Sequence, residues 1–136
     1  MPHSIRLNES LGVIVLRYRG CVDFSELRKV FDTVVLTAGF KEGLSLVADF
    51  RDNSPPLTAQ EIARLADYAK RTDANWGATK WVFITAKDTS FGLARLFSIL
   101  TSNYDVETKA FHTASEADDW LRLGTDVEDI LALTPE

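Results

Sequence analysis

The stretch that decides the fold runs from Leu44 to Glu61 and reads Leu-Ser-Leu-Val-Ala-Asp-Phe-Arg-Asp-Asn-Ser-Pro-Pro-Leu-Thr-Ala-Gln-Glu. Its first part, from Leu44 to Asp49, is almost entirely apolar, which is typical of a parallel strand that is buried on both faces. The chain then carries charge as far as Asp52, crosses two prolines and restarts as a helix at Thr58. The sequence therefore predicts a strand whose charged end reaches the edge of an α/β sheet, where such folds bind ligands and partners.

Strand and helix patterns alternate along the rest of the chain. The predicted strands are Ile5–Leu7, Val13–Arg19, Leu44–Asp49, Lys80–Ala86 and Glu107–His112. The predicted helices begin at Asp23, Thr58, Ser90 (ending at Tyr104) and Ser115, with a last short helix over Asp126–Leu133. This order predicts one α/β domain over residues 1–136, with an N-terminal β-hairpin, a mostly parallel sheet of about five strands and four to five helices.

Two local patterns make the prediction more specific. In the second predicted strand, Ile14, Leu16 and Tyr18 share one face, whereas Val13, Val15, Arg17 and Arg19 share the other. Two helix starts show the capping-box spacing, in which a polar cap is followed three residues later by glutamate. These pairs are Asp23 with Glu26 and Thr58 with Glu61.

The bulk composition excludes several classes of protein. The chain has 136 residues, a net charge of −5 and no cluster of Lys and Arg, whereas a nucleic-acid partner requires a concentrated basic face. No apolar run approaches the roughly 18 residues of a membrane-spanning helix, and no secretory signal is visible. One cysteine, Cys21, leaves no internal disulfide and no metal-ligand spacing. We therefore expect a cytoplasmic protein without a metal or cofactor.

Three segments carry a resemblance to a known family: Val47-Ala48-Asp49-Phe50-Arg51, Phe91-Gly92-Leu93-Ala94-Arg95-Leu96-Phe97 and Ala117-Asp118-Asp119-Trp120-Leu121. With the order of elements, they resemble the SpoIIAA-like family of stand-alone bacterial domains over nearly the whole chain. That family is related to the STAS fold of anti-sigma factor antagonists and, in fold, to the lipid-binding CRAL-TRIO domains. The resemblance implies a regulatory or binding role.

The region before the second long helix departs from the antagonist pattern. Those proteins carry a phosphorylated serine in an Asp-Ser-Ser-Gly type sequence, whereas this chain reads Asp-Asn-Ser-Pro-Pro-Leu-Thr over residues 52–58. Ser54 or Thr58 would be a weak phosphate acceptor, since a helix N-terminus stabilises an anion. Helix capping already explains Thr58, and this is the favoured interpretation.

Charged residues at strand ends form one candidate ligand rim: Asp49, Arg51, Asp52, Lys87 and His112. Because parallel strands end at the same edge, acids and bases could meet there and perform chemistry. The alternative is that these charges are structural, with Asp49 paired to Arg51 or Arg95. The second interpretation is favoured because no nucleophile motif, phosphate loop or metal spacing accompanies them.

The predicted helix Ser90–Tyr104 offers a second candidate. Its packing face holds Leu93, Leu96, Phe97, Leu100 and Tyr104, while Phe91, Arg95 and Ile99 form another row that points away. An apolar row with a central arginine suggests a contact surface for a second copy, a regulatory protein or a lipid. The alternative is that these are isolated exposed residues.

Trp76 is expected in a loop, partly exposed.

Three functions follow, in order of preference. The first is a non-enzymatic STAS-like regulatory or protein-interaction module, homodimeric through the helix Ser90–Tyr104. The second is a small-molecule or lipid-binding domain of the CRAL-TRIO type, which predicts an apolar cavity beside that helix. The third is an enzyme that uses acidic and basic residues at the sheet rim.

Overall fold

The strands of the sheet lie in space in the order in which they follow one another along the chain. A computed structural model describes residues 3–20, 23–53 and 57–135, so Cys21 and Ser54 lie outside the described residues. The strands are β1 (His3–Asn8), β2 (Val13–Gly20), β3 (Ser45–Asn53), β4 (Lys80–Ile84) and β5 (Glu107–Phe111). β1 pairs antiparallel with β2, and the remaining pairs are parallel, which confirms the predicted hairpin and mostly parallel sheet.

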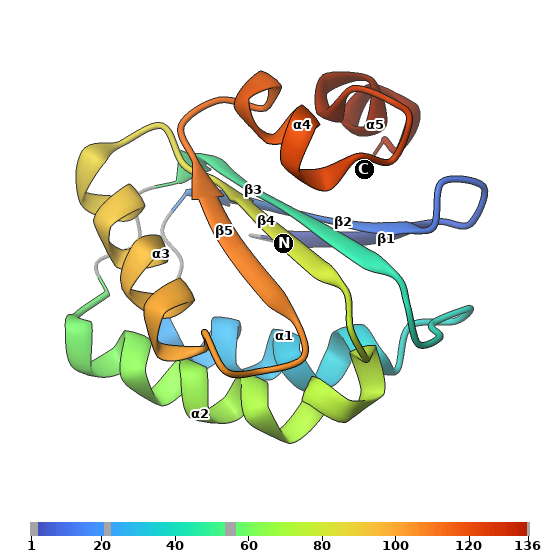
Figure 1. The fold of residues 1–136 in the computed structure, drawn as a ribbon. Helices are drawn as coiled ribbons and strands as arrows, with labels where there is room; N and C mark the ends of the chain where they lie inside the picture. The colour runs from blue at the N-terminus through green and yellow to red at the C-terminus, as the bar shows by residue number, and fades with distance from the viewer. Residues whose placement is uncertain (1–2, 21–22, 54–56, 136) are drawn as a thin grey trace.

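This strand order determines where the helices lie. Because parallel crossovers are right-handed, a strand order without a reversal places every crossover helix on the same face of the sheet. Figure 1 shows α1 (Phe24–Val35), α2 (Ala59–Trp76) and α3 (Asp88–Leu100) on one side. The 3₁₀ turn Ser115–Ala117, α4 (Asp118–Leu121) and α5 (Val127–Leu133) cover the other side. Within the described residues, this sheet therefore has no reversal point of the kind at which many α/β proteins bind ligands.

Each face of the sheet has its own core, as the alternation in β2 predicts. Leu16 and Tyr18 pack with the α1–α3 side, and Val13 and Val15 pack with the α4–α5 side. All four side chains are buried. Arg17 shares the second face but is only half-buried, and its partners are described below.

Both predicted helix caps are present. The Asp23 carboxylate accepts a hydrogen bond from the Glu26 backbone N–H at 2.8 Å. At the start of α2, the Thr58 hydroxyl accepts from the Glu61 N–H at 3.1 Å, and the Glu61 carboxylate accepts from the Thr58 N–H at 2.9 Å. The structural role predicted for Thr58 is therefore confirmed.

Thr58→Ala should lower the free energy of unfolding by about 1 kcal/mol, because the substitution leaves a first-turn N–H without its side-chain acceptor. Urea denaturation of the two proteins measures the difference. Thr58→Ser retains the acceptor and should lose clearly less stability. Equal losses in the two variants would show that the lost methyl group, rather than the cap, accounts for the effect.

The observed elements differ from the predicted ones at several ends. β3 continues four residues past Asp49, because pairing with β2 resumes after an irregularity between Arg17 and Arg19. Arg51 and Asp52, two residues of the expected rim that follow Asp49, therefore lie within β3. α3 is shifted towards the N-terminus relative to the expected Ser90–Tyr104.

The largest error concerns Trp76. It is the last residue of α2 and only 2% exposed, whereas the sequence suggested a partly exposed loop residue. α2 ends there because Gly77 has a φ of +72°, a left-handed conformation that favours glycine.

In the C-terminal segment, a side chain of one helix caps the next. Asp118 does not cap its own helix. Its carboxylate accepts a hydrogen bond from the Val127 N–H at 2.7 Å, at the start of α5.

Among the described residues, no helix is both long enough and apolar enough to span a bilayer.

Candidate functional site

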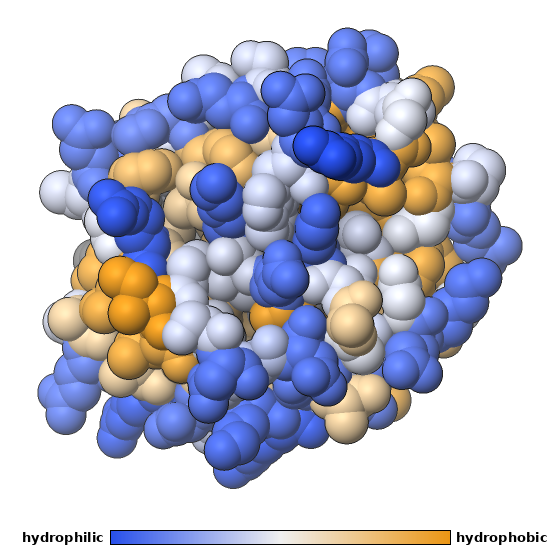
Figure 2. All heavy atoms as spheres, in the orientation of Figure 1, coloured by the Kyte–Doolittle hydropathy of each residue, from blue (hydrophilic) through white to orange (hydrophobic). Residues whose placement is uncertain are grey.

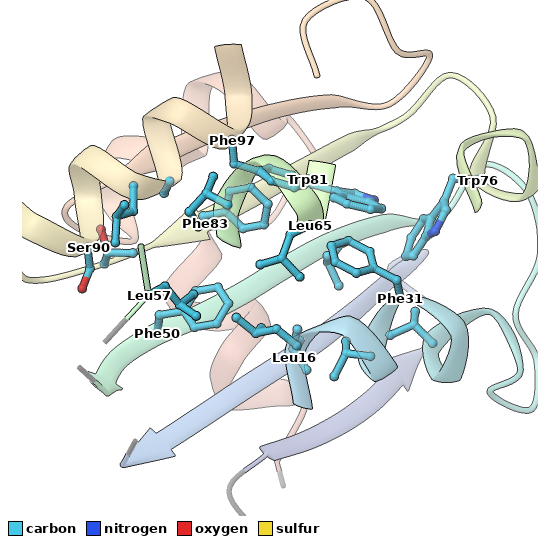
Figure 3. A pocket seen from close by; sticks show the side chains of 18 residues that line it. Leu16, Phe31, Phe50, Leu57, Leu65, Trp76, Trp81, Phe83, Ser90 and Phe97 are labelled. Atoms are coloured by element: carbon cyan, nitrogen blue, oxygen red, sulfur yellow. The ribbon is translucent and has the colours of Figure 1, made fainter. Parts of the chain in front are cut away.

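A cavity lies between the sheet and the helices α1, α2 and α3. Its volume is about 110 Å³. Apolar side chains from all four of these structures form most of its wall (Figure 3), and the aromatic ones are Phe31, Phe50, Trp76, Trp81, Phe83 and Phe97. A cavity of this kind beside the third helix is what the second functional hypothesis predicted.

The two ends of the cavity differ in character. Figure 3 shows Trp76 at one end and Phe50, Leu57 and Ser90 at the other. Trp76 is 2% exposed and closes its end, whereas Phe50 and Leu57 are half-buried. The end near Ser90 is therefore the one closer to solvent.

Two buried polar atoms that belong to lining residues of the cavity have no hydrogen-bond partner among the described residues. They are the Thr85 hydroxyl and the Trp81 indole N–H, and both atoms are buried. Buried polar groups are normally paired, because an unmade hydrogen bond costs about 1–3 kcal/mol. An apolar cavity that has two such residues in its lining is thus suited to a ligand that carries a polar group.

Tyr18 adjoins the cavity through Phe50. Its ring stacks on Phe50 with centroids 5.3 Å apart, and its hydroxyl is buried without a partner among the described residues. Burial raises the pKa of Tyr18 well above its ordinary value, and the nearby carboxylates of Glu26 and Asp23 raise that pKa further. The phenol therefore stays neutral in the folded protein.

This shift in the Tyr18 pKa predicts a loss of stability in alkali. Above about pH 10 the unfolded chain ionises Tyr18 while the folded protein keeps the proton, so stability falls by up to about 1.4 kcal/mol per pH unit. Tyr18→Phe should abolish this contribution, and urea denaturation over about pH 8–11 should show a flatter profile. Near neutral pH the variant should be at least as stable as the wild type. Parallel profiles for the two proteins would contradict the prediction.

The opposite face of the sheet carries a polar cleft of about 330 Å³ at the end of β3. The Arg51 guanidinium donates to both carboxylate oxygens of Asp49 at 3.0 Å, and to Glu128 of α5 at 2.7 Å. The hydrogen bond with Asp49 is the main cause that raises the pKa of Arg51 above its ordinary value. Asp49 thus pairs with one of the two partners that the sequence suggested, and the pair joins β3 to α5.

Asp49→Ala should therefore lower the free energy of unfolding by about 1–2 kcal/mol, because Arg51 loses its two-fold acceptor in a partly buried position. Asp52 is exposed in the same cleft, and Asp52→Ala should change stability by less than about 0.5 kcal/mol. Thermal or urea denaturation measures both. An unchanged or raised stability of Asp49→Ala would favour a catalytic carboxylate over a structural one.

The remaining rim candidates lie elsewhere along the carboxyl edge of the sheet. Lys87 is the residue that precedes α3. His112 follows β5, lies 3.3 Å from Asp88 and stacks on Phe91 with centroids 3.9 Å apart. Asp49, Arg51 and Asp52 line the polar cleft, whereas Lys87 and His112 do not. The expected shared rim is thus divided into two separate groups of residues.

The predicted contact row on α3 is also changed by the structure. Phe91 is half-buried under His112, so it is not a free surface residue. Arg95 is exposed, and Ile99 is 64% exposed. Leu100, which was expected to pack on the sheet, is 40% exposed. Figure 2 shows an apolar patch over α3, and Ile99 and Leu100 are its exposed members.

Sequence reasoning missed the polar end of the cavity. Thr85 directly follows the last residue of β4, and Ser90 lies in the first turn of α3. The sequence did contain an indication of it: both residues are small and polar, and both adjoin apolar segments whose pattern predicts burial. No group of three or more His, Cys, Asp or Glu side chains in the described ranges could hold a metal ion.

Comparison with known proteins identifies the fold class of the chain. No family model matches the chain, and no curated protein matches its sequence. The chain is similar to a solved structure from Shewanella loihica PV-4, described as an uncharacterised protein from the DUF3478 family with a SpoIIAA-like fold. The identity is 13%, the TM-score is 0.54, and the match covers 88% of this chain and 91% of the other. The chain therefore has a SpoIIAA-like fold, as its sequence predicted.

Proposed function

We propose that the protein is a non-enzymatic binding domain for a small apolar molecule, held between the sheet and α1–α3. The observation that carries this proposal is the apolar cavity of about 110 Å³, whose lining residues Trp81 and Thr85 each carry a buried polar atom without a partner among the described residues. An engineered cavity of about 150 Å³ binds benzene. The cavity here is smaller, so it suits at most a single ring or a short chain and excludes a lipid with two full acyl chains.

The proposal also agrees with the roles of the charged residues. Asp49 is bound to Arg51, and Arg51 is bound to Glu128 of α5, so we assign the pair a structural role. The apolar cavity lies on the opposite face of the sheet from Asp49 and Arg51. Catalysis at the polar cleft would therefore not account for the cavity.

Toluene is a suitable probe for this function. Saturating toluene should raise the melting temperature of the protein, since a ligand that binds only the folded state stabilises it in proportion to its occupancy. Ala94 lines the cavity, and Ala94→Leu should fill part of the volume and remove most of the toluene response. Ala74→Leu places the same side chain on an exposed position of α2 and should respond as the wild type does. Absence of a toluene response in the wild type would refute the proposal.

A second candidate is an interaction module that forms a homodimer through α3. The exposed Ile99 and Leu100 beside Arg95 favour it, since apolar side chains with an arginine are typical of interface cores. Ile99→Asp should then convert a dimer into a monomer in sedimentation experiments. Leu133→Asp is a matched control, because Leu133 of α5 is also 64% exposed, and it should remain dimeric. A monomeric wild type would exclude this candidate.

A further inference from the structure

We propose that the ligand of the cavity is a small monocarboxylate with an aromatic ring or a short branched chain, and that its carboxylate lies at the N-terminus of α3. This inference rests on the proposed binding of an apolar molecule. It adds the chemistry of the polar end of that molecule.

Two hydroxyl groups belong to the residues that line the cavity. Of the described residues that line the cavity, Thr85 and Ser90 alone carry a hydroxyl, and Figure 3 shows the oxygen atoms at the Ser90 end. Thr85 is 3% exposed and Ser90 is 8% exposed. The Thr85 hydroxyl has no partner among the described residues. Each hydroxyl can donate one hydrogen bond to an oxygen of the ligand.

The N-terminus of α3 lacks a side-chain cap. α3 has 13 residues, and Lys87 precedes it without a side-chain hydrogen bond to its first turn. In α1 and α2, by contrast, one first-turn N–H donates to the side chain of the capping residue, Asp23 or Thr58. An uncapped N-terminus presents backbone donors and a partial positive charge, and both favour an anion.

The charged side chains nearby agree with this assignment. Lys87 adds a cation at the helix end. Asp88, the one acidic residue in the first turn, faces solvent with a side chain that is 99% exposed and contacts His112 at 3.3 Å. It therefore does not occupy the cavity. Because the whole chain has a net charge of −5, long-range attraction does not select an anion, and the local donors must do so.

The shape of the cavity determines the rest of the ligand. The closed end is formed by aromatic rings, including Trp76 and Trp81, which are 5.0 Å apart. The carboxylate would lie at the opposite end, next to the half-buried Phe50 and Leu57. One side of the anion then keeps contact with water, so burial of the charge is only partial.

Titration of the wild type with three probes tests the inference: benzoate, benzyl alcohol and toluene. Benzoate should bind at least about tenfold more tightly than benzyl alcohol, because the donors and the helix end favour the anion. Thr85→Val should weaken benzoate about tenfold and change the affinity for toluene by less than about twofold. Ser90→Ala should act in the same direction. Calorimetry or amide chemical shifts provide the affinities, and circular dichroism verifies that each variant is folded.

Thr89→Val is the matched control. Thr89 lies in the same first turn of α3 but is exposed and does not line the cavity, so its substitution should leave the binding of benzoate unchanged. If benzoate binds no more tightly than benzyl alcohol, or if Thr85→Val leaves its affinity unchanged, the inference is wrong, while toluene binding would still support the proposed function. If toluene and benzoate both fail to bind, both proposals are wrong.

Discussion

Replacing Trp76 with alanine should lower the free energy of unfolding by about 3–5 kcal/mol, the range of large aromatic deletions from a core. The side chain is 2% exposed. It makes edge-to-face contacts with Phe40 and Trp81 at centroid distances of 4.9 and 5.0 Å, and such aromatic pairs add to the effect of burial. Urea denaturation should show a lower midpoint with an unchanged slope, because the surface exposed on unfolding stays almost the same.

Trp120→Ala is the control for this experiment. Trp120 is half-buried on the other face of the sheet, with a centroid distance of 6.0 Å to Phe111. Its loss should cost about half as much as the loss of Trp76, since less surface leaves water on folding. Equal losses in the two variants would show that Trp76 is not the central core residue that its contacts indicate.

Arg17→Ala should be the second large effect, with a loss of about 2–3 kcal/mol. The guanidinium donates to the Thr134 carbonyl oxygen at 2.6 Å and also to the Leu131 carbonyl oxygen. These carbonyls lie at the C-terminal end of α5, whose last turn contains no basic residue of its own. Arg17 therefore satisfies orphan acceptors and supplies a positive charge at the negative end of the helix dipole.

Hydrogen exchange can localise the effect. In Arg17→Ala the amides of α5 should lose protection before those of the central strands, because α5 loses a polar attachment to the sheet. Binding of toluene should stay unchanged, since the cavity lies on the other face. Arg6→Ala is the control: Arg6 is exposed and donates to the adjacent Ile5 carbonyl at 3.0 Å, so its loss should be below about 0.5 kcal/mol. A global loss of protection in Arg17→Ala would contradict a local role.

Local features were predicted well. The caps at Asp23 and Thr58 are present, because a capping bond joins residues three positions apart and depends on little else. The hairpin and the faces of β2 are also as predicted, since alternation decides which side of a strand enters a core. These features together were sufficient for the fold class.

Element ends were predicted less well. β3 continues to Asn53 because β2 offers it a partner after the irregularity at Arg17. A strand end therefore depends on pairing between distant segments as well as on local composition. The composition of the rim depends on packing in the same way: Asp49, Arg51 and Asp52 share the polar cleft, whereas Lys87 and His112 do not line it.

The sequence by itself determined the alternation of strands and helices, the capped helix starts and the two faces of the sheet, because each of these depends on residues a few positions apart. Only the tertiary structure decided that Trp76 is buried, that Arg17 caps α5, and that Thr85 and Ser90 both line an apolar cavity. Arg17 and Thr134 are 117 positions apart. Contacts of this range arise when the whole chain is packed, and no local pattern encodes them.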